Sequence, residues 1–239
     1  MWIEEYARNL QLLAIQHVGD YLETGSKELL MEQARQLRDS AKRRREKSLI
    51  KWEFTILREH PLMFKTDDHK LKADVAGIVK GMGDIIEEVN TLLRIWCLDE
   101  KVYYREGIDG EEVKRKLAVS GKRVLVRFHF DRRAANARRP EPLYHLQVGG
   151  KSLDDECCWF PEDIDVPRFH FPPMDIVLLC ELVLVNFFHK QSEELRKKPE
   201  WRSLVRKSQE IFQSDYFDKC SLHLRNQTDT LLGHLMSIS

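Results

Sequence analysis

This sequence has no long apolar run, no CxxC pair of cysteines and no net charge. The most apolar stretch, MDIVLLCELVLVNFF, is shorter than the roughly 20 residues that a helix needs to span a bilayer. The opening residues, MWIEEYARNL, lack the positive start and apolar run of a signal peptide. The 39 basic and 39 acidic residues cancel, which argues against a uniformly basic nucleic-acid-binding protein. These absences predict a cytoplasmic protein that does not insert into a membrane.

The cysteines and the missing catalytic motifs further limit the kinds of metal or catalytic site that this protein can contain. The five cysteines include no CxxC pair, and an odd number without a framework predicts free thiols in a reducing compartment. Cys157 and Cys158 are adjacent, whereas zinc ligands usually come in spaced pairs. The chain has no HExxH helix, nucleophile elbow, Walker loop or kinase signature. We therefore predict no resident cofactor, with a bound divalent metal as the alternative.

The composition is that of a globular protein with a highly charged surface, because 42% of the residues are hydrophobic and 33% are charged. Residues 1 to about 95 predict helices. Gly25 would end the first helix, Ser26 would cap a second over 27–59, and a third would run from 67 to 93.

The hydrophobic period changes to two after about residue 94. Short alternating runs up to residue 171 predict a small antiparallel sheet. Three helices then follow Pro172 and Pro173, over 174–190, 192–213 and 216–236. The fold class is therefore α+β, with a helical N-terminal section at 1–95 and an α+β core at 96–239 that form one compact unit.

The strand RVLVRFHFD raises the main functional question. Its apolar side chains alternate with Arg127, His129 and Asp131, and side chains of a strand alternate between the two faces of a sheet. The later runs YHLQV and VPRFH alternate in the same way. If the apolar sets all face the core, the opposite face gathers Arg127, His129, Asp131, His145, Gln147, Arg168 and His170.

These side chains suit several chemistries. His129, His145 and His170 could bind a divalent metal or, with Asp131, transfer protons. Arg127 and Arg168 could bind phosphate. The alternative is an ordinary solvated face or a partner contact, and a register shift of one residue would reverse the whole arrangement. The spacing matches no established catalytic motif, so we favour this alternative.

Two basic segments are further candidates for phosphate or nucleic-acid contact. One is the run that contains Arg43, Arg44 and Arg45. The other is the loop that contains Arg132, Arg133, Arg138 and Arg139. Each phosphate contact would add salt-dependent affinity. Neither segment interleaves aromatic residues for base stacking, and most such runs are solvated surface.

The apolar stretch at 174–190 nearly encircles a helix with hydrophobic side chains. Such a helix needs cover on all sides. We expect the sheet and the other helices to provide that cover, with an obligate protein interface as the alternative.

The middle of the chain is similar to a group of uncharacterised prokaryotic proteins encoded near phage-defence and other mobile gene clusters. The shared pattern comprises Phe128 to Asp131, His145 and Leu146, Gly149 and Gly150, Pro167 and Arg168, and Asn186 and Phe187. The resemblance extends from about 124 to 188 and does not cover the N-terminal hundred residues. It implies a bacterial cytoplasmic protein with an accessory role in a multi-component system. No established activity of this group points to a reaction.

These observations favour a non-catalytic interaction or sensor component of a cytoplasmic multi-protein system, which the resemblance links to antiviral defence. Such a component would bind another protein subunit. The first alternative is a histidine-dependent phosphoesterase or nuclease, and the second is a nucleic-acid-binding accessory protein. The sequence does not predict an oligomeric state.

Overall fold

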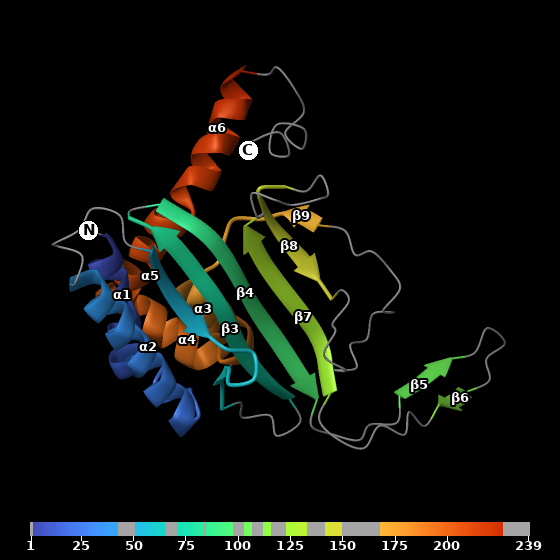
Figure 1. Ribbon diagram of the computed structural model, residues 1–239. Coiled ribbons are helices and arrows are strands. Elements are labelled where there is room, and N and C mark those ends of the chain that lie inside the picture. The colour runs from blue at the N-terminus through green and yellow to red at the C-terminus, as the bar shows by residue number, and fades with distance from the viewer. Residues whose placement is uncertain are drawn as a thin grey trace.

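An antiparallel sheet with helices packed against it forms the body of the protein (Figure 1). The computed structural model describes residues 2–42, 51–65, 71–83, 85–97, 103–106, 112–115, 123–132, 142–149 and 168–226. The first helices are α1 (Trp2–Leu12), the π-helical turn η1 (Leu13–His17) and α2 (Thr24–Lys42). The strands are β1 (Lys51–Ile56), β2 (Leu62–Met63), β3 (Leu71–Met82), β4 (Ile85–Cys97), β5 (Tyr103–Glu106), β6 (Glu112–Arg115), β7 (Arg123–Arg132), β8 (Tyr144–Val148) and β9 (Arg168–His170). The last helices are α3 (Ile176–Phe187), α4 (His189–Lys197), α5 (Pro199–Phe212) and α6 (Ser214–Asn226).

The main sheet has seven strands in the order β1-β3-β4-β7-β8-β9, with β2 also paired to β3. All of its neighbouring strands are antiparallel. The strands β5 and β6 form a separate two-stranded hairpin. Helices before and after this sheet confirm the predicted α+β class.

The prediction of helices up to residue 95 is wrong for the described residues from 51 onward, which form β1 to β4. The apolar residues of this segment recur at helical spacing, and the prediction followed that spacing. The segment also carries β-branched residues such as Val75, Ile78 and Val79, which favour strands. Met82 pairs directly with Ile85, and Gly83 between them has a φ of 61°, which only glycine adopts readily. Gly83 therefore belongs to the turn of a hairpin between β3 and β4.

The first helix boundary also differs from the prediction. Gly25 and Ser26 both lie inside the first turn of α2, so Gly25 does not end a helix and Ser26 is not an N-cap. The Ser26 hydroxyl instead accepts a hydrogen bond from the backbone N–H of Met63 at 2.8 Å. This residue ties α2 to β2.

The hydrophobic core lies between the sheet and the helices, which gather on one face in Figure 1. The strands contribute Trp52, Phe54, Ile56, Ala73, Val75, Val79, Val89, Leu93, Ile95 and Phe130 to this core. The apolar helix α3 lies in the same core, with Ile176 to Cys180, Val183 and Leu184 buried. Its burial confirms the core interpretation of this helix.

Polar contacts fix the start of α3. Asp175 caps the helix, because its Oδ1 accepts a hydrogen bond from the N–H of Leu178 at 3.0 Å. Its Oδ2 accepts a second hydrogen bond from the Ser208 hydroxyl at 2.6 Å. The Thr91 hydroxyl donates to the Met174 carbonyl at 2.6 Å and joins β4 to the same helix start.

The first helix packs against a helix close to the other end of the described chain. The rings of Tyr6 in α1 and Phe212 in α5 lie 5.1 Å apart, and Lys207 forms an ion pair with Glu5. Tyr6 also contacts Phe54 in β1. These contacts place α1 beside α5, with Tyr6 reaching both α5 and β1.

Within the part of the chain that the structure describes, no helix has both the length and the apolar character that crossing a membrane requires.

Candidate functional site

The strand register places the predicted site residues on one face of the sheet, opposite the helices. Asp131 pairs with His145, which pairs in turn with His170. The next row joins His129, Gln147 and Arg168 in the same way. Directly opposed residues share a face, so the predicted alternation and its common face are confirmed.

The neighbouring strands add residues that the sequence interpretation did not include. Arg127 pairs with Arg94 on β4, and Arg94 pairs with Asp74 on β3. Trp96 follows Arg94 at the next position on the same face. We call the combined set the charged face, and it comprises Asp74, Arg94, Trp96, Arg127, His129, Asp131, His145, Gln147, Arg168 and His170.

A buried ion pair anchors one end of the charged face. The Nε of Arg94 donates to Oδ1 of Asp74 at 2.9 Å, and neither side chain is more than 6% exposed. Trp96 donates its indole N–H to the other oxygen of Asp74, and the Arg94 guanidinium lies 4.9 Å from the centre of the Trp96 ring. Arg94 also donates to the backbone carbonyl of Arg58 at 2.8 Å. The network ties the turn after β1 to the charged face.

The pKa of His129 shows which charges surround this residue on the charged face. Its pKa is lowered to about 4, first by burial and then by the positive charges of Arg58, Arg127 and Arg94, with a further contribution from His145. Burial and like charges both disfavour the protonated ring. The His129 imidazole is therefore neutral at physiological pH and lies in a strongly positive environment.

His145 has a defined orientation between two other groups. Its Nδ1 lies 3.1 Å from the Pro142 carbonyl oxygen, which can only accept a hydrogen bond, so this nitrogen carries the proton. Its Nε2 lies 3.9 Å from Oδ2 of Asp131. His170 is opposite on β9, and its pKa is lowered by burial and then by His145. Neither ring nitrogen of His170 has a hydrogen-bond partner among the described residues.

The predicted metal ligands do not form a three-residue centre. In the described ranges, no three His, Cys, Asp or Glu side chains lie close enough together to hold a metal ion. His129 occupies a different row from His145 and His170. Metal binding by these three residues stays a prediction without geometric support.

The predicted basic candidates do not join the charged face within the described chain. Arg132 directly follows Asp131 in β7, so it lies on the opposite face of the sheet, where it pairs with Tyr144. Arg132 also donates a hydrogen bond to the Glu87 carbonyl at 2.8 Å. The other arginines of the two basic segments lie outside the described residues, namely Arg43, Arg44, Arg45, Arg133, Arg138 and Arg139. Cys157 and Cys158 also lie outside them.

Asp74 was missed because its segment was interpreted as a helix, and Arg94 was missed because it lay at the boundary between that helix and the predicted sheet. A period of two was readable in both segments, since Lys72 and Asp74 alternate with buried residues of β3, and Arg94 and Trp96 follow the same rule on β4. That signal could have found them.

Comparisons of the chain with protein-family models, with curated proteins and with solved structures find no match. The resemblance of residues 124–188 to a prokaryotic family therefore stays a prediction, and the charged face must be interpreted from its own chemistry.

Proposed function

We propose that the protein is a non-catalytic recognition component that binds a small phosphate-bearing ligand on the charged face. The observation that supports this most strongly is the positive environment of His129, whose pKa is lowered to about 4 by burial and by three arginines. Asp74 already pairs with Arg94, and an anionic ligand would lower the electrostatic cost of the positive charges that remain around His129 in this partly buried site.

The residue types favour phosphate over other anions. Arginine presents a planar fork of donors that matches the oxygens of phosphate, and the charged face uses arginine rather than lysine at its centre. Arg168 and His129 flank Gln147 in one row, and all three side chains are partly exposed. This row offers charged and neutral donors to the oxygens of one ligand.

The state of His129 supports binding rather than turnover. A general acid or base is most effective when its pKa lies near the working pH. The pKa of His129 lies well below that range. The neutral ring can still donate one hydrogen bond to an oxygen of the ligand.

A small ligand is favoured over a nucleic-acid strand. Proteins that bind single strands stack successive bases on aromatic side chains. Trp96 is the aromatic residue of the charged face, and Arg94 already lies over its ring. A row of stacking platforms is absent from the described strands of this face.

A role inside a larger assembly is the second part of the proposal. Helix α6 projects from the body of the protein in Figure 1. Its Phe217 and Leu222 side chains are 55% and 51% exposed, so both offer apolar surface to a partner. A protein subunit that covers α6 would remove these side chains from water.

Calorimetry with inorganic pyrophosphate tests the ligand assignment on the full chain. We expect binding that weakens with added salt and that Arg168→Gln reduces at least tenfold, because this variant removes one charged fork. Arg206→Gln is the matched control, since Arg206 is exposed on α5 and pairs with Glu210. Equal affinity for the two variants, or no binding by the folded wild-type protein, would contradict the proposal.

The phosphoesterase alternative has one specific observation in its favour. His145 is oriented by the Pro142 carbonyl and faces Asp131 at 3.9 Å, an arrangement that can orient a histidine for proton transfer. Release of p-nitrophenol from bis(p-nitrophenyl) phosphate that is lost in His145→Asn would favour this alternative. No release from protein that binds pyrophosphate would favour recognition alone.

A further inference from the structure

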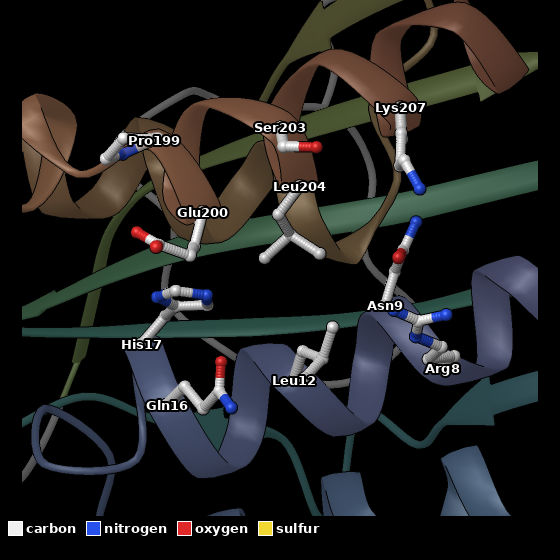
Figure 2. Close-up of a pocket in the computed structure, with 10 residues that line it drawn as sticks. All are labelled: Arg8, Asn9, Leu12, Gln16, His17, Pro199, Glu200, Ser203, Leu204 and Lys207. Atoms are coloured by element: carbon white, nitrogen blue, oxygen red, sulfur yellow. The ribbon is translucent and has the colours of Figure 1, made fainter.

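A groove separates α1 and η1 from α5, within the helical layer of the protein (Figure 2). Its volume is about 490 Å³, which lies within the range of small-molecule sites. Figure 2 shows Leu12 and Leu204 facing each other across its middle. The groove belongs to different elements from the charged face and requires its own explanation.

An uncommon backbone conformation forms one wall of this groove. The N–H of Val18 donates to the carbonyl of Leu13 at 2.8 Å, five residues earlier, so η1 is a single π-helical turn. Such turns are rare and occur frequently at functional sites. This one ends at His17, whose ring contacts the Trp201 ring of α5 with centroids 5.3 Å apart.

Two buried polar atoms along the groove have no hydrogen-bond partner among the described residues. They are Nδ2 of Asn9 and Nδ1 of His17, in side chains that are 3% and 7% exposed. Buried polar groups in proteins are almost always hydrogen-bonded. Both residues line the groove, and a bound ligand could supply the missing partners once small side-chain rotations turn these buried atoms toward it.

The two ends of the groove differ in charge. Arg8, Asn9 and Lys207 lie at one end in Figure 2, and all three offer N–H donors. Lys207 is already paired with Glu5 at 2.5 Å, which leaves about one positive charge for a ligand. This end therefore suits a singly charged carboxylate better than a doubly charged phosphate.

The opposite end offers a carboxylate. Glu200 lies there beside His17 and Gln16, and its side chain is exposed. Burial and then the charge of Lys198 lower the pKa of His17, and the charge of Glu200 raises it, with a lowered pKa as the net effect. The His17 ring is therefore neutral, and Lys198 is a cation close to the same end as Glu200. A ligand ammonium would complement Glu200.

The spacing of the two ends sets the length of the ligand. Asn9 and His17 are eight residues apart, and an α-helix rises about 1.5 Å per residue, so the ends lie at most roughly 12 Å apart, because the π-helical turn rises less per residue. An extended peptide spans at most about 3.3 to 3.6 Å per residue. Three to four residues would therefore connect the ends, with an apolar side chain on Leu12 and Leu204.

We propose that this groove binds a short extended peptide with free termini, with its carboxylate at Arg8 and Asn9 and its ammonium at Glu200. The ligand class follows from the opposite charges at the two ends, the apolar middle and the two polar atoms without a partner among the described residues. The site is independent of the charged face, so the two proposals can succeed or fail separately.

The tripeptide Ala-Leu-Ala is a direct probe for the full-length protein by calorimetry. We expect the peptide with free termini to bind, C-terminal amidation to weaken binding at least tenfold, and N-terminal acetylation to weaken it at least fivefold. Arg8→Gln should remove the preference for the free carboxylate, and Glu200→Gln should remove the preference for the free amine. Each variant changes an exposed side chain, so both should fold.

Arg202→Gln and Glu210→Gln are the matched controls, because both residues are exposed on α5 and neither lines the groove. Both controls should keep both preferences. Failure of the free peptide to bind at millimolar concentration would overturn the proposal. Equal binding of the free and modified peptides, or an unchanged preference in Arg8→Gln and Glu200→Gln, would overturn it as well.

Discussion

The two faces of the main sheet are built by different physical means. The helix-covered face consists of apolar side chains such as Phe54, Val79 and Leu93, all nearly inaccessible to water. The charged face holds Asp74, Arg94 and Arg127 with almost as little exposure. Burial of apolar area stabilises the first face, whereas burial of charge on the second is tolerable only with matched partners.

This contrast shows where the protein depends on specific pairing. Apolar side chains tolerate many neighbours of the right size, so the helix-covered face determines the fold without demanding particular partners. A buried charge requires a particular partner at hydrogen-bond distance. The charged face is therefore the part of the sheet where single changes should separate stability from binding.

The largest effect is expected for the Asp74–Arg94 pair. Asp74→Ala leaves Arg94 buried without its carboxylate, and we expect it to lower the free energy of unfolding by about 3–5 kcal/mol. The double variant Asp74→Leu with Arg94→Met should recover most of this loss, because apolar residues can replace a buried ion pair. Urea unfolding of the three proteins measures both effects.

Phe54→Ala is the comparison on the other face, with a similar expected loss from its cavity. A double variant as unstable as Asp74→Ala would show that the pair has no special role.

The next effect is a pH dependence that arises on the charged face. His129 has a pKa of about 4 in the folded protein, and an unfolded histidine titrates near 6.5. Between these values the unfolded chain binds more protons, so stability should fall as the pH drops through this window, by on the order of 3 kcal/mol. His129→Gln should remove most of that fall. Urea midpoints measured at several pH values would reveal it, and identical slopes for the two proteins would contradict the assignment.

A smaller effect is expected at the turn that both faces share. Gly83 has a φ of 61° with open space around the position of a Cβ atom, so Gly83→Ala meets backbone strain but no clash. The expected loss is about 1 kcal/mol. Thermal unfolding measures it, and Gly25→Ala is the control, because Gly25 lies in a helix and also has open space. A loss in both variants would exclude the left-handed conformation as the cause.

The smallest effect on stability is expected outside both faces. Phe217 is exposed on α6, so Phe217→Ser should change the free energy of unfolding by less than about 0.5 kcal/mol. If α6 binds another subunit, the same change should reduce the amount of that subunit that co-purifies with the chain. Mass spectrometry of the native complex measures it. A clear loss of stability would instead place Phe217 in the core of the isolated chain.

The sequence predicted the fold best where one period dominates. The strands at 123–132 and 144–148 alternate strictly, and Pro172 and Pro173 precede the apolar helix, so all three elements were recognised. The segment at 71–97 carries apolar residues at spacings that suit both a helix and a strand. Pairing with β7 decides between them, and pairing is a long-range property.

The candidate site was predicted in part for the same reason. His129, His145 and His170 could be assigned to one face because alternation is local information. Their rows, their burial and the addition of Asp74 and Arg94 depend on register between strands far apart in the chain. The groove beside η1 had no sequence signal at all, since a π-helical turn has none that periodicity detects.

The packing of α1 against α5 has a consequence for the synthesis of this protein. Glu5 and Lys207 are 202 residues apart, and a ribosome adds about 5–20 residues per second. The first helix therefore waits roughly 10–40 seconds for its partner, and the Tyr6 ring is not covered by Phe212 during that time. The contacts between α1 and α5 can form only after translation has passed α5, so this part of the helical layer is completed late.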